Sequence, residues 1–157
     1  MTARLAWRVL AEHWDTYWLG YVVELPGCQF RAGTLDELLQ RAPQAIASHL
    51  AWLRGHGLQG IDRPADFFLL TERVQALPGG RGPLFDADRR NLSASELDVA
   101  LQVGNAAIED LVALAGRTQA WAARAESERP SGWLPPAILH HVAEKDVWYA
   151  ARLMPDI

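Results

Sequence analysis

The chain has 157 residues and a mass of 17.4 kDa, enough for one ordinary domain or for two small domains that share a core. Its formal charge of -4 and its pI near 5.7 argue against a surface dominated by phosphate-binding Lys and Arg side chains. A single cysteine, Cys28, excludes an intramolecular disulfide and a cysteine-only zinc cluster. Neither a signal-peptide core nor an uninterrupted apolar run of about 18 residues is present, so we expect a cytoplasmic protein without a membrane span.

Three short strand patterns open the chain. Residues 3–11 alternate, with one apolar set formed by Leu5, Trp7, Val9 and Ala11. Residues 13–16 interrupt the alternation, and residues 17–25 resume it, which predicts a hairpin. In the second strand one face carries Leu19, Tyr21, Val23 and Leu25, and the opposite face carries Trp18 and Val22. The Pro26-Gly27 turn then leads to a third strand at 29–32.

A helix and a fourth strand follow. Thr34 and Glu37 have the spacing of a capping box, which predicts a helix start. The helix carries an apolar stripe of Leu35, Leu38, Leu39, Ala42, Ile46, Leu50 and Leu53. Pro43 lies inside this stripe and predicts a kink, and Gly55-His56-Gly57 predicts the end. Alternation over 66–74 predicts the fourth strand.

The remaining sequence predicts a linker and a helical unit. Residues 76–83 are rich in turn-forming residues, and with the polar run through Asn91 they predict a linker over 76–92. A second capping box at Ser93 and Glu96 opens a helix that ends near Gly116. Its apolar stripe is formed by Leu97, Leu101, Gly104, Ile108, Leu111 and Ala115. A last helix begins at Pro135-Pro136 and carries the stripe Ile138, Leu139, Val142, Tyr149 and Leu153. We therefore expect domains at 1–75 and 93–157.

With the order strand, strand, strand, helix, strand in place, residues 4–74 resemble a HicB-type domain, the antitoxin half of HicA/HicB systems. The resemblance rests on three segments: Gly20 to Cys28 (GYVVELPGC), Gly33 to Leu38 (GTLDEL) and the helix end Ala51-Trp52-Leu53. It implies an α+β fold like a degraded ribonuclease H, and a role in blocking a small HicA-like toxin ribonuclease rather than in cutting RNA.

Residues 93–154 resemble the first two helices of the DinB/YfiT-like superfamily. The carriers are Gly132 to Pro135 (GWLP), Ile138 to Glu144 (ILHHVAE) and Trp148 to Leu153 (WYAARL). Complete members are four-helix bundles, many with a metal held by histidines, and the helix-two histidine of that pattern best matches His141. The helices expected to bring the other histidines lie beyond this resemblance, so a metal site would need a second subunit.

Several residues invite a chemical interpretation. His141, with Glu144 one turn on, is the candidate ligand for a divalent metal such as zinc, nickel or manganese, although a hydrogen-bonded histidine on a helix face is the favoured alternative. His140 points about 100° away and is expected in solvent. His13 and Asp15 share a turn and are expected to serve its geometry.

The acids and the thiol are expected to be structural. Glu12 and Glu24 lie on adjacent predicted strands, where a ribonuclease-H-like enzyme would hold metal ions, but two carboxylates are too few and we expect them on the surface. Cys28 follows Pro-Gly and is expected to be a small packed residue rather than a nucleophile. No catalytic residue and no cofactor is therefore assigned.

These features favour a non-enzymatic interaction or regulatory module. The second apolar face of the sheet could bind a partner protein such as a HicA-like toxin, pair with another subunit, or lie beneath the C-terminal helices of the same chain. Two helices with bare apolar faces, together with seven tryptophans, favour a homodimer or higher oligomer that completes a four-helix bundle. The alternative is a metal-binding DinB-like enzyme or remnant with a site formed between subunits.

Overall fold

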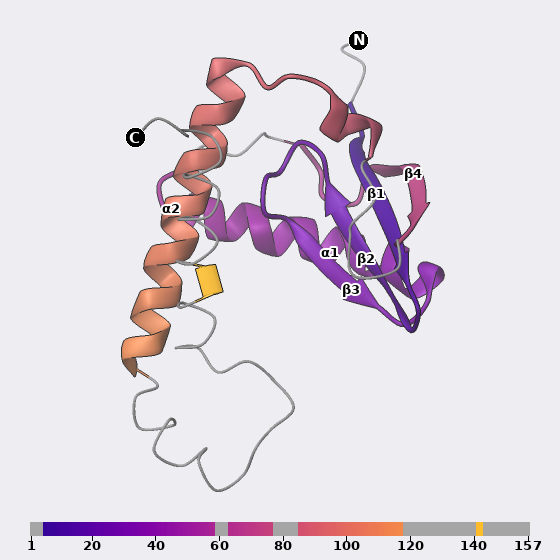
Figure 1. The fold of residues 1–157 in the computed structure, drawn as a ribbon, viewed down its shortest axis with the longest axis horizontal. Coiled ribbons are helices and arrows are strands. Elements are labelled where there is room, and N and C mark those ends of the chain that lie inside the picture. The colour runs from indigo at the N-terminus through magenta and orange to yellow at the C-terminus, as the bar shows by residue number, and fades with distance from the viewer. Residues whose placement is uncertain (1–4, 59–62, 77–84, 118–140, 143–157) are drawn as a thin grey trace, which may run out of the picture. The chain divides into compact units, whose positions relative to one another are not determined.

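The protein is described here from a computed structural model, which describes residues 5–58, 63–76, 85–117 and 141–142. Its elements follow the order β1 (Trp7–Trp14), β2 (Tyr17–Val22), β3 (Gln29–Ala32), α1 (Leu35–Gly55), β4 (Phe68–Gln75), a 3-10 turn (Asp86–Arg89) and α2 (Ala94–Arg117). The four strands form one mixed sheet in the order β3-β2-β1-β4 (Figure 1). The α+β class and the predicted order of strands and helix are thus confirmed.

The chain divides into two compact units, residues 1–104 and 105–157. The first unit contains the sheet, α1, the 3-10 turn and the first turns of α2. Part of the predicted linker is therefore packed structure, because Phe85 is buried and residues 86–89 form the 3-10 turn. The sequence-based limits at 75 and 93 stay a prediction, and α2 runs across the boundary between the units.

The hairpin is longer at its tip than the sequence predicts. β1 begins at Trp7 and continues through Trp14, so only Asp15 and Thr16 form the turn. The prediction that Leu5 belongs to the buried face is wrong, since this residue precedes the strand and is exposed. β2 ends at Val22 because the chain leaves the sheet through the Pro26-Gly27 turn.

Glycine has a definite role at two positions in this region. Gly27 has a φ of +80°, which favours a residue without a side chain. Gly20 lies opposite Phe30 on β3, and a Cβ built on it would lie 2.6 Å from the Phe30 ring. The missing side chain therefore gives the Phe30 ring its place over β2.

Helix α1 covers one face of the sheet. Its buried stripe of Leu38, Ala42, Ile46, Leu50 and Leu53 was predicted and is confirmed. The helix continues through Pro43 without a break. At its start Thr34 Oγ1 accepts a hydrogen bond from the Glu37 amide at 3.2 Å, while Glu37 accepts one from the Gly33 amide at 3.2 Å. At its end Gly57, with φ +70°, reverses the chain, as the glycine pattern predicts.

The face of the sheet under α1 is formed by alternating residues of the two central strands. Trp7, Val9 and Ala11 of β1 are fully buried, and Val22 of β2 lies beside Val9. Trp18 also packs against the cluster around Ala11. The side of β2 that faces the helix is thus the one with Trp18, Gly20 and Val22, opposite to Leu19 and Tyr21.

Strand β4 pairs parallel to β1 with one extra residue. Val9 pairs with Leu70 and Leu10 with Glu72, so Thr71 is the bulged residue. Leu70 therefore packs with the α1-side core, while Glu72 lies on the other face of the sheet beside Leu10.

Helix α2 starts as predicted. The Ser93 amide and hydroxyl donate to Glu96 at 2.8 and 2.9 Å, and the Glu96 amide donates back to the Ser93 hydroxyl at 3.2 Å. The side of the helix that packs into the first unit carries Val103, which is 6% exposed. By a helical repeat of about 100° per residue, the predicted stripe is centred about 120° around the helix from Val103. Its residues Leu97, Leu101, Gly104 and Ile108 are exposed, and Leu111 and Ala115 are half-buried.

By length and composition alone, α2 could cross a membrane, and it is the one helix among the described residues of which this is true. Of its most apolar 18-residue window, 17% is buried. Core helices of soluble proteins share this composition. Asp98, Gln102, Asn105 and Glu109 recur at helical spacing and form a polar strip along α2. The helix is therefore amphipathic, with an apolar stripe, a polar strip and a packed side.

We expect Gly20→Ala to destabilise the first unit by about 1–3 kcal/mol, because the new methyl group would displace the Phe30 ring. Urea unfolding followed by tryptophan fluorescence measures this loss. Gly55→Ala is the matched control, since no atom lies within 4 Å of its Cβ position and helix propensity favours alanine. Equal stability of the two variants would contradict the assigned role of Gly20.

Candidate functional site

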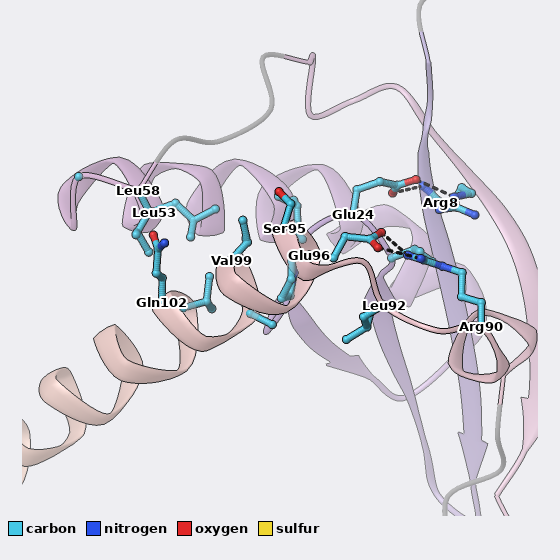
Figure 2. Close-up of a pocket in the computed structure, with 16 residues that line it drawn as sticks. Arg8, Glu24, Leu53, Leu58, Arg90, Leu92, Ser95, Glu96, Val99 and Gln102 are labelled. Carbon is cyan, nitrogen blue, oxygen red and sulfur yellow. Dashed lines mark hydrogen bonds and ion pairs between the residues drawn. The ribbon is translucent and has the colours of Figure 1, made fainter.

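The first unit contains an open cavity of about 670 Å³. Its walls are the chain after β2, the C-terminal end of α1 and the segment that leads into α2 (Figure 2). The lining residues are Arg8, Val23, Glu24, Leu25, Pro26, Leu53, Gly57, Leu58, Arg90, Leu92, Ser95, Glu96, Val99, Ala100, Gln102 and Val103. The volume falls within the ~300–1,000 Å³ range of small-molecule sites.

One end of the cavity is apolar. Leu53 belongs to the buried stripe of α1, and Leu58 follows the reversal at Gly57 that returns the chain over the helix end. Val99 and Val103 come from one side of α2, four residues apart, and therefore lie on successive turns. Val99 is 44% exposed although it lines the cavity, so its side chain is within reach of a ligand.

The other end carries charge. Figure 2 shows two ion pairs there, Arg8 with Glu24 and Arg90 with Glu96. Arg90 donates through both terminal nitrogens to the two oxygens of Glu96, at 3.0 and 2.6 Å. Arg90 and the Ser93 bonds together lower the pKa of Glu96 to about 2. This bidentate clamp fixes residues 90–93 against the first turn of α2 and so shapes the cavity wall.

The second ion pair joins β1 to the chain after β2. Glu24 accepts hydrogen bonds from the Arg8 backbone amide at 3.0 Å and from Arg8 Nε at 2.6 Å. Glu24 lies beyond the end of β2 and is half-buried, not fully on the surface as predicted. The terminal nitrogens of Arg8 make no hydrogen bond within the described part of the chain, and half of this side chain is exposed.

Glu12 lies on the face of the sheet opposite to α1 and does not line the cavity. The prediction of a surface position is wrong, since Glu12 is only 3% exposed. Its Oε2 accepts a hydrogen bond of 2.8 Å from the Tyr21 hydroxyl, while its Oε1 has no partner among the described residues. Phe85 packs edge-on against Tyr21, so the chain after β4 helps to cover this pair. The second apolar face of the sheet is thus partly covered by the chain itself.

Burial explains the chemistry of this pair. Burial first, and then the hydrogen bond to Glu12, raise the pKa of Tyr21 far above its usual value. The phenol therefore keeps its proton and donates a hydrogen bond to the carboxylate. A buried carboxylate with one unpaired oxygen is costly, which makes the Tyr21 bond important for stability.

The metal hypothesis concerns residues that lie mostly outside the described ranges. His141 is described, as a half-buried residue in a helical turn, whereas His140 and Glu144 fall outside. No group of three His, Cys, Asp or Glu that could hold a metal occurs among the residues that were placed. The role of His141 as a metal ligand stays a prediction.

The other candidate residues, His13, Asp15 and Cys28, lie in positions that serve packing or turn geometry. His13 Nδ1 lies 2.8 Å from Gln75 Oε1, and its ring stacks on Trp18 at 4.4 Å, so it ties β1 to β4. Asp15 is an exposed turn residue. Cys28 is buried, and burial raises its pKa to about 11 from 9.0, which keeps the thiol protonated at neutral pH.

Sequence patterns did not point to the cavity residues. Arg8 belongs to an exposed strand position, and Arg90 lies in the predicted linker, where no periodic pattern gives it a partner. The useful signal was the capping box at Ser93 and Glu96, since it places Glu96 in the first turn of α2. Apolar walls beside paired charges suit the binding of a small molecule or a peptide side chain.

We expect Tyr21→Phe to cost roughly 1–3 kcal/mol at neutral pH, because it leaves the second Glu12 oxygen unpaired. The folded state holds the Tyr21 proton more tightly than the unfolded state. The phenol's contribution is therefore complete below pH ~10 and is lost as the pH rises above it. In urea unfolding from pH 7 to 11, the free energy of unfolding should fall more steeply with rising pH in the parent chain than in Tyr21→Phe. Tyr17→Phe is the control, and an equal effect from it would contradict the assignment.

Glu96 should titrate by carbon-detected NMR with a pKa of about 2. Stability that depends on this ionised carboxylate is present above its ordinary pKa of 4.5 and is lost as the pH falls toward 2. In Arg90→Gln the pKa should return toward its ordinary value, because the guanidinium is the largest cause of the shift. An unchanged titration in that variant would show that the clamp does not form in solution.

Comparison with family models, curated proteins and solved structures gave no significant match for this chain.

Proposed function

We propose that this chain is a non-enzymatic, cytoplasmic protein-interaction module that self-associates through α2. The observation that carries the proposal is the exposed apolar stripe of this helix. Leu97, Leu101 and Ile108 are 49%, 58% and 40% exposed. Large exposed apolar patches are typical of surfaces that bind another molecule.

The spacing of the stripe supports a second helix as its occupant. Leu97, Leu101, Gly104, Ile108, Leu111 and Ala115 follow one another at alternating intervals of four and three residues. This is the heptad spacing of helices that pack side by side. Gly104 lies in the middle of the stripe, and no atom lies within 4 Å of its Cβ position, which leaves room for close approach of a second backbone.

A second copy of this chain is the partner that we favour. A two-fold axis beside α2 would pair the stripe of one copy with the same stripe of the other, so each contact occurs twice in the dimer. The polar strip, with Glu109 near the helix middle, favours a protein partner over a lipid environment. Completion of a helical bundle by two copies is the arrangement expected from the resemblance to half of a DinB bundle.

The resemblance to HicB domains adds a second partner to this proposal. The sheet order and the helix on one face are compatible with a domain of that kind, and a toxin of the HicA type would be neutralised by binding rather than by chemistry. If a small HicA-like reading frame adjoins this one, its product should co-purify with the chain. If the HicA-like product does not co-purify with the chain, the toxin-neutralising role is excluded. The proposal of self-association is not affected by that result.

We expect the purified chain to have the mass of a dimer or higher oligomer by light scattering. Leu101→Gln and Ile108→Gln should weaken association at least about tenfold, because each removes apolar burial of ~1.5–3 kcal/mol from both copies. Leu69→Gln is the matched control, since Leu69 is 59% exposed on β4 and lies off the stripe. A monomer in the parent chain, or sedimentation with phosphatidylcholine vesicles instead of self-association, would overturn the proposal.

A further inference from the structure

At the polar end of the cavity, the two terminal nitrogens of Arg8 have no hydrogen-bond partner among the described residues. In the Arg90–Glu96 pair both carboxylate oxygens and both terminal guanidinium nitrogens are engaged. In the Arg8–Glu24 pair, Arg8 uses only Nε and its backbone amide. A guanidinium has five N–H donors in a planar fork, so the edge formed by its two terminal nitrogens is left for another acceptor.

The charges around this edge define the kind of group that fits. Two arginines and two glutamates balance at this end of the cavity, and both glutamates are already held by guanidinium groups. An added cation would find no carboxylate oxygen without a donor, whereas an added carboxylate would find the Arg8 fork. Planar carboxylates bind guanidinium groups through two parallel hydrogen bonds.

The rest of the cavity fits an apolar body. Leu53, Leu58 and Val99 lie at the end away from the ion pairs, together with Gln102 (Figure 2). Leu25, Pro26 and Val103 also line the cavity. Burial of a hydrocarbon chain here is worth about 25 cal/mol for each Å² removed from water. A ligand that reaches both ends therefore combines an apolar tail with an acidic head.

We propose that the cavity binds a small amphipathic carboxylate, with its carboxylate on the terminal nitrogens of Arg8 and its apolar tail between α1 and the first turns of α2. Arg90 and Glu96 position the wall and do not contact the head group. This site is separate from the proposed association surface, because Val99 and Val103 lie on the side of α2 opposite to Leu97 and Leu101.

Three probes with one tail and different heads test the proposal: decanoate, decanol and decylammonium, each below the concentration at which it forms micelles. Titrations of the full chain are followed by amide NMR and calorimetry. Decanoate should bind at least about tenfold more tightly than the other two, since only its head makes charge-assisted bonds with Arg8. Amide shifts should centre on the residues that line the cavity.

Two variants and two controls separate head from tail. Arg8→Gln should remove the preference for decanoate and leave decanol binding unchanged. Val99→Trp should weaken all three probes by filling the apolar end. Arg73→Gln changes an exposed arginine of β4 that does not line the cavity, and Leu101→Gln changes the stripe of α2, so neither should alter binding.

Equal affinity for the three probes, a preference for decylammonium, or no binding would each overturn the proposal. An unchanged preference for decanoate in Arg8→Gln would also overturn it, since Arg8 is not one of the buried core residues. The mass measurement on Leu101→Gln is independent of these titrations, so failure of the cavity and failure of self-association are distinguished.

Discussion

The packing of α1 on the central strands is the contact on which the other features depend. Trp7 and Ile46 are both fully buried and belong to one core cluster, which fixes the helix against β1. The ends of that packed layer then set the positions of functional interest. Beyond Val22 the chain turns back at Gly27, and beyond Gly55 it turns back at Gly57. Residues of both reversals, Pro26 and Gly57, line the cavity. The cavity lies between these reversals and α2.

Much of this first unit could be predicted from the sequence. The capping residues Thr34 and Ser93, the stripe of α1 and the order of the strands follow from local patterns, and the structure confirms them. Local patterns are informative here because caps and amphipathic faces depend on residues three or four apart. The family resemblances, by contrast, remain hypotheses about partners and chemistry.

The parts that could not be predicted depend on contacts distant in sequence. Glu12 is at a strand position that looks solvent-exposed, and its burial requires Tyr21 on the next strand and Phe85 from beyond β4. Which side of α2 is exposed could not be predicted either. The helix is apolar on two sides, and periodicity alone does not tell which side the first unit buries. In the structure the side with Val103 is buried, and Leu97, Leu101 and Ile108 of the heptad stripe are exposed.

The pairing of β4 with β1 has a consequence for how the chain folds. β1, β2 and β3 are joined by short turns and pair antiparallel, whereas β4 pairs parallel with β1 across about sixty residues that include α1. Non-local parallel pairs form slowly, because the loop must close before its contacts are gained. Until β4 docks, β1 presents an open edge with the apolar residues Val9 and Leu10. During synthesis, this interval is when the chain is most exposed to edge-to-edge aggregation.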